Sequence, residues 1–282
     1  MATDPEMVTD PETVVVERRR RPRGPSGTVI LRDLEFDPVS EAEAAAEIIR
    51  RSQQGEGGWV STPNTHQLEL IAKSDELRKL VETASMTLAD GMPLVWASQL
   101  QGTPLPERVA GSDLVWSLAR AAAANGASLF LLGGDEGVGP RAQATLERSI
   151  PGIRIVGTYS PPIGFENDPA ELEKIRQTLA ERKPDLVYVG LGFPKQERLI
   201  CSLTPSLPRT WFLGIGMSLS FISGDMSRAP GWMQQHGLEW VHRLLSEPQR
   251  LFARYVLHGI PFTCGLLIRS VVVRAWRPQT GR

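Results

Sequence analysis

Short apolar runs alternate with longer helical patterns between residue 28 and about residue 215, and this alternation restricts the fold more than any other feature. Strands that alternate with helices of about 10–15 residues form βαβ units, whose strands pair in parallel. Runs such as 129–132 (LFLL) and 186–189 (LVYV) are apolar at every position, as expected where helices cover both faces of a sheet. The sequence therefore predicts an α/β fold with a largely parallel sheet flanked by helices. The predicted strands are 28–32, 59–61, 86–89, 128–132, 153–157, 186–191 and 210–214, and the predicted helices are 40–53, 65–83, 93–100, 112–125, 138–149, 169–181 and 195–203.

The composition is ordinary for a soluble globular protein and argues against several functional classes. Of the 282 residues, 41% are hydrophobic and 22% are charged, and the net charge of −1 gives no general attraction to nucleic acid. The two cysteines, Cys201 and Cys264, have neither CxxC spacing nor a histidine at metal-ligand spacing. This pattern predicts a reducing compartment and neither a disulfide framework nor structural zinc. No uninterrupted apolar run reaches the roughly 18–20 residues of a spanning helix and no secretory signal is visible, so we expect a cytoplasmic protein.

Charge and proline content divide the chain into three parts. Residues 1–27 form a Pro-rich tail that is predicted to be disordered, and its arginine run is more typical of a solvated tail than of a nucleic-acid arm. Residues 28–235 form the α/β core. Residues 236–282 hold seven arginines, two glutamates and no lysine, a balance of +5, and 259–276 are strongly apolar with interspersed arginines. We expect a basic, amphipathic appendage that lies on a membrane surface and does not span it.

Polar side chains gather at three points where an apolar run gives way to a helical pattern. These points are T-P-N-T-H-Q (62–67), L-A-D-G-M-P-L-V-W-A-S (88–98) and V-G-L-G-F-P-K-Q-E (189–197). In an open α/β sheet such junctions are the carboxyl ends of strands, where ligand sites form. Asp90 at the second junction is therefore placed to act as a general base. The alternative is structural, because Asp90, Thr62 and Asn64 also suit turns and helix N-caps.

Other residues near these junctions are candidates for binding phosphate or sugar hydroxyls. Gly133 and Gly134 lie between a predicted strand and a helix, where backbone N–H groups approach a phosphate; the spacing is not G-x-G-x-x-G, and a plain tight turn fits equally well. Lys195 and Gln196 open a helix after Pro194, a routine place for proline, and are also able to bind hydroxyls or phosphates. Arg108 lies in a loop that either reaches over the cleft or is simply exposed.

The arginines of the appendage form a further candidate site. Arg243, Arg250 and Arg254 share one helical face if the helix continues through Pro248. Such a face is usually solvated, but beside an apolar segment it also suits a diphosphate or an anionic lipid. The chain has no D-x-D cluster, no GxxxxGK[ST] and no G-x-S-x-G, which removes most support from ATPases and hydrolases. We expect neither a metal nor a cofactor.

Five ordered motifs connect these candidates to a known family. They are T-P-N (62–64), L-A-D-G-M-P-L-V-W-A (88–97), P-E-R-V-A-G-S-D (106–113), G-L-G-F-P-K-Q-E (190–197), and R-A-P-G-W-M-Q followed by G-L-E-W-V-H-R-L and E-P-x-R (228–250). This pattern, over about residues 28–255, resembles the WecG/TagA/CpsF family, the glycosyltransferases of family 26 that build bacterial surface polysaccharides and teichoic-acid linkage units. The resemblance implies a Rossmann-like core and an inverting, metal-independent transfer of a hexose-type sugar from a UDP-sugar to a polyprenyl-diphosphate-linked sugar. It also implies a peripheral enzyme on the inner face of the cell membrane, in a family where oligomers are common.

The same resemblance implies roles for individual residues. Asp90 is the general base, and the residues that line its pocket are Thr62, Asn64, Arg108 and Gln196. It also implies that Arg243, Arg250 and Arg254 hold the diphosphate. Together with the candidates from the pattern, the expected substrate contacts are Gly133, Gly134, Gly192, Lys195, Glu197, Ser220, Arg243, Arg250 and Arg254. Ser220 marks a departure, because many members have an aspartate there, in the pattern G-V-G-x-x-x-D-x-x-x-G. That aspartate is associated with the nucleotide end of the site, so the donor sugar stays open.

Two other functions fit parts of the sequence. A nucleotide-dependent oxidoreductase fits the alternation and the glycine turn, but the dinucleotide fingerprint is missing, and NAD(P) binding distinguishes this alternative. A non-catalytic UDP-sugar-binding or scaffold protein fits Ser220, and it predicts UDP binding without turnover.

Overall fold

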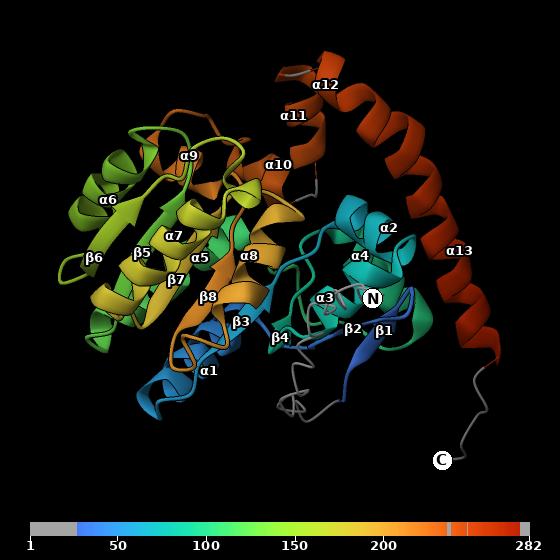
Figure 1. Cartoon of the computed structure of the whole chain (residues 1–282). Coiled ribbons are helices and arrows are strands. Elements are labelled where there is room, and N and C mark those ends of the chain that lie inside the picture. The colour runs from blue at the N-terminus through green and yellow to red at the C-terminus, as the bar shows by residue number, and fades with distance from the viewer. Residues whose placement is uncertain (1–26, 236–237, 247, 277–282) are drawn as a thin grey trace, which may run out of the picture.

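Six short strands form one parallel sheet at the centre of the computed structural model, which describes residues 27–235, 238–246 and 248–276 (Figure 1). The order across the sheet is β4-β3-β8-β7-β5-β6, and every neighbouring pair is parallel. This arrangement confirms the predicted α/β, Rossmann-like fold. The strands are β3 (Gly58–Ser61), β4 (Met86–Thr87), β5 (Ser128–Gly133), β6 (Arg154–Tyr159), β7 (Leu186–Gly190) and β8 (Trp211–Gly214).

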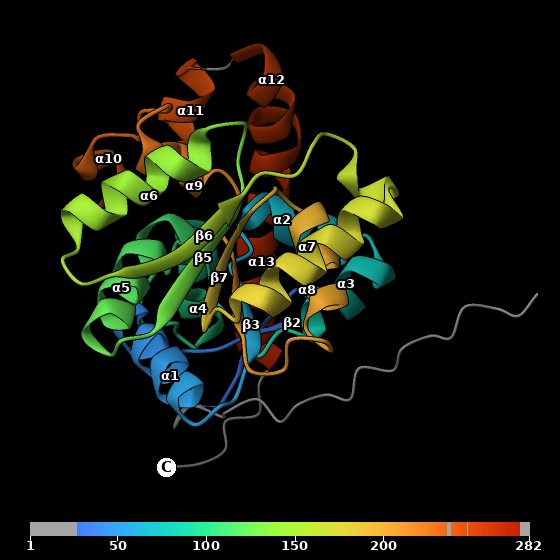
Figure 2. The ribbon, with the colours of Figure 1, turned by 60° about the vertical axis from the view of Figure 1, so that its left-hand side comes forward.

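Helices cover both faces of this sheet, which explains the uninterrupted apolar strands. Alternate residues of β5 enter two separate cores: Leu129 and Leu131 pack on one face, and Phe130 and Leu132 pack on the other. The first face is covered by α1 (Glu41–Gln53), α5 (Gly111–Ala124), α6 (Val138–Ser149) and α9 (Ser218–Ser223), and the second by α7 (Pro169–Arg182) and α8 (Lys195–Leu203), with a 3-10 turn η1 (Phe165–Asn167) before α7. Figure 2 shows the two layers on either side of the strands.

The direction of the connections reverses in the middle of the sheet. β5 leads through α6 to β6 on one side, whereas β7 leads through α8 to β8 on the other. β5 and β7 are neighbours, and the carboxyl ends of the strands at such a reversal are where open α/β sheets usually bind ligands.

Two predicted elements differ from the structure. The first predicted strand, 28–32, forms β1 (Val29–Leu31), but it pairs antiparallel with an unpredicted strand, β2 (Leu34–Phe36), outside the central sheet. The predicted helix 65–83 is two helices, α2 (Thr65–Ala72) and α3 (Asp75–Glu82). The second begins because the Ser74 side chain accepts a hydrogen bond from the Leu77 amide at 3.3 Å and caps it. With α4 (Met92–Gln101) these elements enclose a third apolar core.

The carboxyl-terminal part is a chain of helices that returns to this third core. It contains α10 (Gly231–Gln235), α11 (Glu239–Ser246), α12 (Pro248–Phe252), a π-helical stretch η2 (Ala253–Gly259) and α13 (Ile260–Trp276). In Figure 1, α13 runs down the right-hand side past α2 and α4, and its Leu266 and Ser270 are buried. The helix Tyr255–Trp276 is long and apolar enough to cross a membrane by length and composition, although the sequence contained no uninterrupted apolar run of that length. This helix contains too few arginines for its composition to exclude a membrane-spanning segment.

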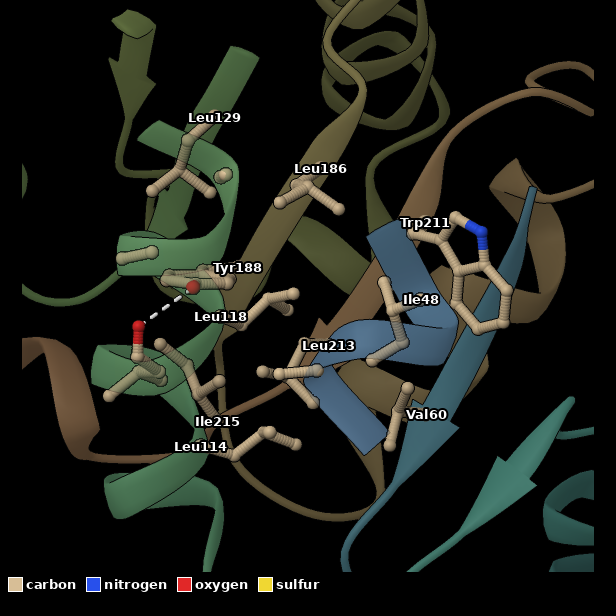
Figure 3. Packing of buried hydrophobic residues seen from close by; sticks show 14 of the residues in the cluster. Ile48, Val60, Leu114, Leu118, Leu129, Leu186, Tyr188, Trp211, Leu213 and Ile215 are labelled. Atoms are coloured by element: carbon tan, nitrogen blue, oxygen red, sulfur yellow. Dashed lines mark hydrogen bonds between the residues drawn. The ribbon is translucent and has the colours of Figure 1, made fainter. Parts of the chain in front are cut away.

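One buried hydrogen bond links the sheet to the helix layer, and it gives a first prediction. The Tyr188 hydroxyl donates to the Val115 carbonyl at 2.8 Å inside the core (Figure 3). We expect Tyr188→Phe to lower the free energy of unfolding by about 1–2 kcal/mol, because the carbonyl loses a partner where water cannot replace it. Urea unfolding measures the change. A stability within about 0.5 kcal/mol of the parent would contradict it.

Candidate active site

Asp90 lies directly beyond β4, at the carboxyl edge of the sheet. Its amide donates to the Pro63 carbonyl at 3.2 Å, which joins the loops that follow β3 and β4. The N-cap of α4 is Gly91, at a φ of 155°, and no side chain caps that helix. The structural alternative for Asp90 as a cap is therefore wrong, and its carboxylate is available for another role.

The surroundings of Asp90 favour a carboxylate that holds a proton more strongly than usual. Its side chain is 29% exposed, and burial raises the pKa of Asp90 from 3.8 to about 6. The guanidinium of Arg108, 3.6 Å from Asp90, opposes this by favouring the charged form of the carboxylate. Glu239 and Asp113 raise the pKa further and Arg243 lowers it. A pKa near 6 suits a base at neutral pH, since the group is ionised yet still takes a proton readily.

A row of alternating charges extends from Asp90 to the carboxyl-terminal helices. Arg108 Nη2 donates to Asp113 Oδ2 at 2.8 Å, and Arg228 Nη1 donates to Asp113 Oδ1 at 2.6 Å. Arg228 Nη2 lies 3.7 Å from Glu239 Oε2, and Arg243 Nε lies 3.9 Å from Glu239 Oε1. The motifs also contain three residues for which spacing alone predicts no role, namely Asp113, Arg228 and Glu239.

The loop after β3 places its predicted residues near Asp90 but gives them contacts of their own. Thr62 Oγ1 donates to the Gly214 carbonyl at 3.5 Å, across from β3 to β8. The Asn64 side chain accepts from the amides of His66 and Gln67, each at 3.1 Å, and so caps α2. The structure therefore shows Asn64 as the N-cap of α2, and a contact between Asn64 and substrate stays a prediction.

Glycines shape the carboxyl ends of β5 and β7. A Cβ on Gly133, at a φ of 110°, would lie 2.4 Å from the Gly190 carbonyl oxygen, and the Gly134 amide donates to that oxygen at 2.9 Å. Gly192, at a φ of 76°, has open space around it. The helices that follow β5, β7 and β8, namely α6, α8 and α9, have no side-chain caps. The amides of Val138, Gln196 and Ser218 donate to backbone carbonyls, so only the other first-turn N–H groups are suited to an anion.

The motif that opens α8 divides into a buried and an exposed part. Gln196 Oε1 accepts from the Gly216 amide at 3.0 Å, while its Nε2 donates to Glu197 Oε1 at 2.8 Å. Both side chains are buried, and burial raises the pKa of Glu197 to about 7. These two residues hold the turn after β8. Lys195 is exposed and forms an ion pair with Glu166.

The predicted contacts of the appendage are only partly described. Arg243 lies on α11 with its guanidinium 5.2 Å from the centre of the Phe221 ring of α9, the helix that also carries the half-buried Ser220. The side chains of Arg250 and Arg254 lie outside the described residues. α11 ends at Ser246, α12 begins at Pro248, and residue 247 between them lies outside the described residues. A shared helical face for the three arginines therefore stays a prediction.

Comparison with known proteins identifies the family. The model of the family described as "Glycosyl transferase WecG/TagA/CpsF family" matches residues 29–276, which include the sheet, the charge row and α13. The chain is a member of this family.

Named relatives support the same assignment. A Bacillus spizizenii protein named N-acetylglucosaminyldiphosphoundecaprenol N-acetyl-beta-D-mannosaminyltransferase is 32% identical over 197 residues, which are 70% of this chain and 74% of the relative. Proteins of the same name from Bacillus subtilis (31% identical, 69% and 73% covered) and Staphylococcus aureus (31%, 68% and 74%) also match. The glycosyltransferase is thus a hexosyltransferase, as predicted, and the oxidoreductase and non-catalytic alternatives find no support among these relatives.

The environment of Asp90 predicts that it destabilises the fold above pH 6. Because its pKa is about 6 in the folded protein and 3.8 ordinarily, ionisation favours the unfolded chain. We expect Asp90→Asn to raise the free energy of unfolding by on the order of 2 kcal/mol at pH 8, with the gain shrinking to near zero by about pH 4. Urea unfolding at both pH values tests this. A gain that is equal at both would contradict the raised pKa.

Proposed function

We propose that this glycosyltransferase transfers a hexose-type sugar, with inversion and without a metal, from a UDP-sugar to a polyprenyl-diphosphate-linked sugar. The observation that carries the proposal is Asp90, a partly buried carboxylate with its pKa raised to about 6, at the carboxyl edge of the sheet beside Arg108. The resulting polymer belongs to the bacterial cell wall or surface.

The proposed reaction needs one base and one stabilised leaving group. Asp90 takes the proton from the acceptor hydroxyl as its oxygen bonds to the anomeric carbon, and the bond from that carbon to the diphosphate oxygen breaks on the opposite face. UDP leaves with the bonding electron pair. A single displacement of this kind inverts the anomeric centre, so a UDP-α-sugar yields a β-linkage.

The carboxyl ends of β5 and β7 are suited to the diphosphate of the leaving group. Both strands are followed by glycines at positive φ and by helices, α6 and α8, that have no side-chain cap, which is a typical setting for phosphate binding. Arg108 and Arg243 add positive charge near Asp90. Among residues 27–235, 238–246 and 248–276, no three His, Cys, Asp or Glu side chains group as metal ligands, so we assign charge stabilisation to these donors.

The relatives guide the choice of acceptor. Their printed name describes transfer to N-acetylglucosaminyldiphosphoundecaprenol. We propose an acceptor of this class, a sugar on a polyprenyl diphosphate. The donor sugar is a separate question, because Ser220 stands where many members carry an aspartate.

The lipid acceptor requires the site to work at a membrane, and α13 supports this location. Its exposed apolar side chains include Ile268 (66% exposed) and Val272 (49% exposed), one helical turn apart. An apolar stripe with flanking arginines is typical of helices that lie in the interface of anionic bilayers. We propose a cytoplasmic enzyme, peripheral on the inner face of the membrane.

A donor screen tests the reaction. Purified protein is incubated with a short-chain polyprenyl-diphosphate N-acetylglucosamine and UDP-N-acetylmannosamine, UDP-glucose, UDP-glucuronate or UDP-galactose, and UDP release is measured. We expect acceptor-dependent release from one donor and a loss of about 10²–10⁴-fold in Asp90→Asn, since general-base catalysis is worth this much. Release by Asp90→Asn near the parent rate would remove Asp90 from the base role.

Vesicle binding tests the location. We expect Ile268→Ser/Val272→Ser to lower co-sedimentation with phosphatidylglycerol vesicles by about tenfold or more, because each buried apolar side chain is worth about 1.5–3 kcal/mol. The control is Ile163→Ser, which changes a fully exposed isoleucine in the loop between β6 and α7. Equal binding of all three proteins would contradict the interfacial role of α13.

A further inference from the structure

Asp113 holds two arginines at once and has no role in the reaction proposed above. We propose that Asp113 is a positioning residue for Arg108, and that through Arg228 and Glu239 it makes the place of Arg108 beside Asp90 depend on the docking of α11. The inference rests on the proposed function, because it takes Asp90 as the base.

The first support is the use of both carboxylate oxygens. Asp113 Oδ2 accepts from Arg108 at 2.8 Å, and Oδ1 accepts from Arg228 at 2.6 Å. All three side chains are largely buried, and charge-assisted hydrogen bonds in such a place fix the orientation of a guanidinium. Asp113 stands in the first turn of α5, where the helix dipole also favours a negative charge. The anchor is therefore rigid.

The second support is the unequal position of Arg108 between two carboxylates. It donates a hydrogen bond to Asp113, but it stays 3.6 Å from Asp90, beyond hydrogen-bond length. Asp90 thus has a cation nearby that does not occupy its lone pairs. If Asp113 lost its charge, Arg108 would be drawn to Asp90 and pair with it directly. That pairing would weaken Asp90 as a base and block the acceptor hydroxyl.

The third support is Arg228, which connects the core to α11. Its Nε and Nη2 are buried without a hydrogen-bond partner among the described residues, and its nearest second anion is Glu239 at 3.7 Å. Removing α11 would leave this buried cation with Asp113 alone, which is costly. Glu239 also lies 3.9 Å from Arg243 of the same helix. The carboxylate of Asp113 therefore connects the position of Arg108 to the position of α11, through Arg228.

The test compares Asp113→Asn, Glu239→Gln and the double variant. Both substitutions keep the size of the side chain and remove one negative charge. Asp225→Asn is the matched control, because it breaks a 2.7 Å ion pair between Arg141 of α6 and the turn after α9. Two quantities are measured: steady-state UDP release against pH with the donor and acceptor found in the screen, and hydrogen–deuterium exchange of residues 239–246.

We expect Asp113→Asn to lower kcat about 10–100-fold with a smaller change in KM, because a misplaced group costs this much in a preorganised site. The acidic limb of the pH profile moves to lower pH, since Asp90 loses the charge of Asp113 while Arg108, Arg228 and Arg243 still face it. Glu239 remains as the other anion near Asp90. Exchange of α11 becomes faster in both single variants. Their effects on kcat are not additive in the double variant, as expected of residues that act through one arginine.

The outcomes separate this inference from the proposed function. A parent enzyme that transfers sugar, with an Asp113→Asn variant whose pH profile and α11 exchange match those of Asp225→Asn, overturns the inference alone. A parent that releases no UDP from any donor contradicts the proposed function. In that case faster exchange of α11 in both variants still supports the link from Asp113 to α11, and unchanged exchange overturns it.

Discussion

The close approach of β5, β7 and β8 at their carboxyl ends shapes the edge of the sheet at which the proposed site lies. A Cβ on Gly190 would lie 2.9 Å from the Gly216 carbonyl oxygen, and one on Gly214 would lie 2.8 Å from the side-chain Nε2 of Gln196. With Gly133 against Gly190, these contacts leave no room for side chains between the strand ends. The chain after each strand turns away into a helix, and α6, α8 and α9 all begin at the carboxyl edge of the sheet. Buried Gln196 and Glu197 hold the last of these turns from behind.

Charge placement then determines what that edge of the sheet is able to do. A carboxylate in a dry place is a strong base, but without a neighbouring cation it stays protonated, and with a direct ion pair it loses its basicity. The structure avoids both extremes, because burial and two other carboxylates raise the pKa of Asp90 while two arginines lower it. The balance near 6 depends on side chains from the core and from α11 together. The raised pKa makes Asp90 a better base, but the same burial of its charge lowers the stability of the fold.

The sequence predicted the elements that depend on local pattern and missed those that depend on tertiary pairing. Seven strands were placed within about two residues, and those buried on both faces, such as β5 and β7, were recognisable as apolar runs. The hairpin of β1 and β2 was missed, since its turn uses Arg32 and Asp33 at positive φ (49° and 65°) where glycine or asparagine usually gives the signal. The break after α2 was missed because Ser74 sits within an otherwise continuous helical pattern.

The site was predictable only in part for the same reason. Asp90 and Arg108 stand at strand ends or in loops that motif and topology point to, and the structure brings them to 3.6 Å. Arg228 meets Asp113 across 115 positions of the chain, and no spacing rule connects two such residues. Gln196 was expected to face a pocket, yet its amide is engaged by the turn after β8. A motif locates a residue at the site but does not say which neighbour its side chain binds.

The packing of α13 favours a helix that lies on a membrane surface over one that crosses the membrane. Its inner side packs on the core, where Leu266 is buried in the third cluster and Arg32 lies 5.2 Å from the centre of the Phe262 ring. At the surface, the exposed Arg269 lies 3.4 Å from Asp33. To cross a bilayer, the helix would leave this cluster open to water and carry Arg269 into hydrocarbon, both of which are costly. Lying flat keeps those contacts and leaves Ile268 for lipid. Because α11 and α13 belong to one carboxyl-terminal segment, a helix held flat on the membrane would also keep Glu239 and Arg243 near the surface from which a lipid-linked acceptor reaches Asp90.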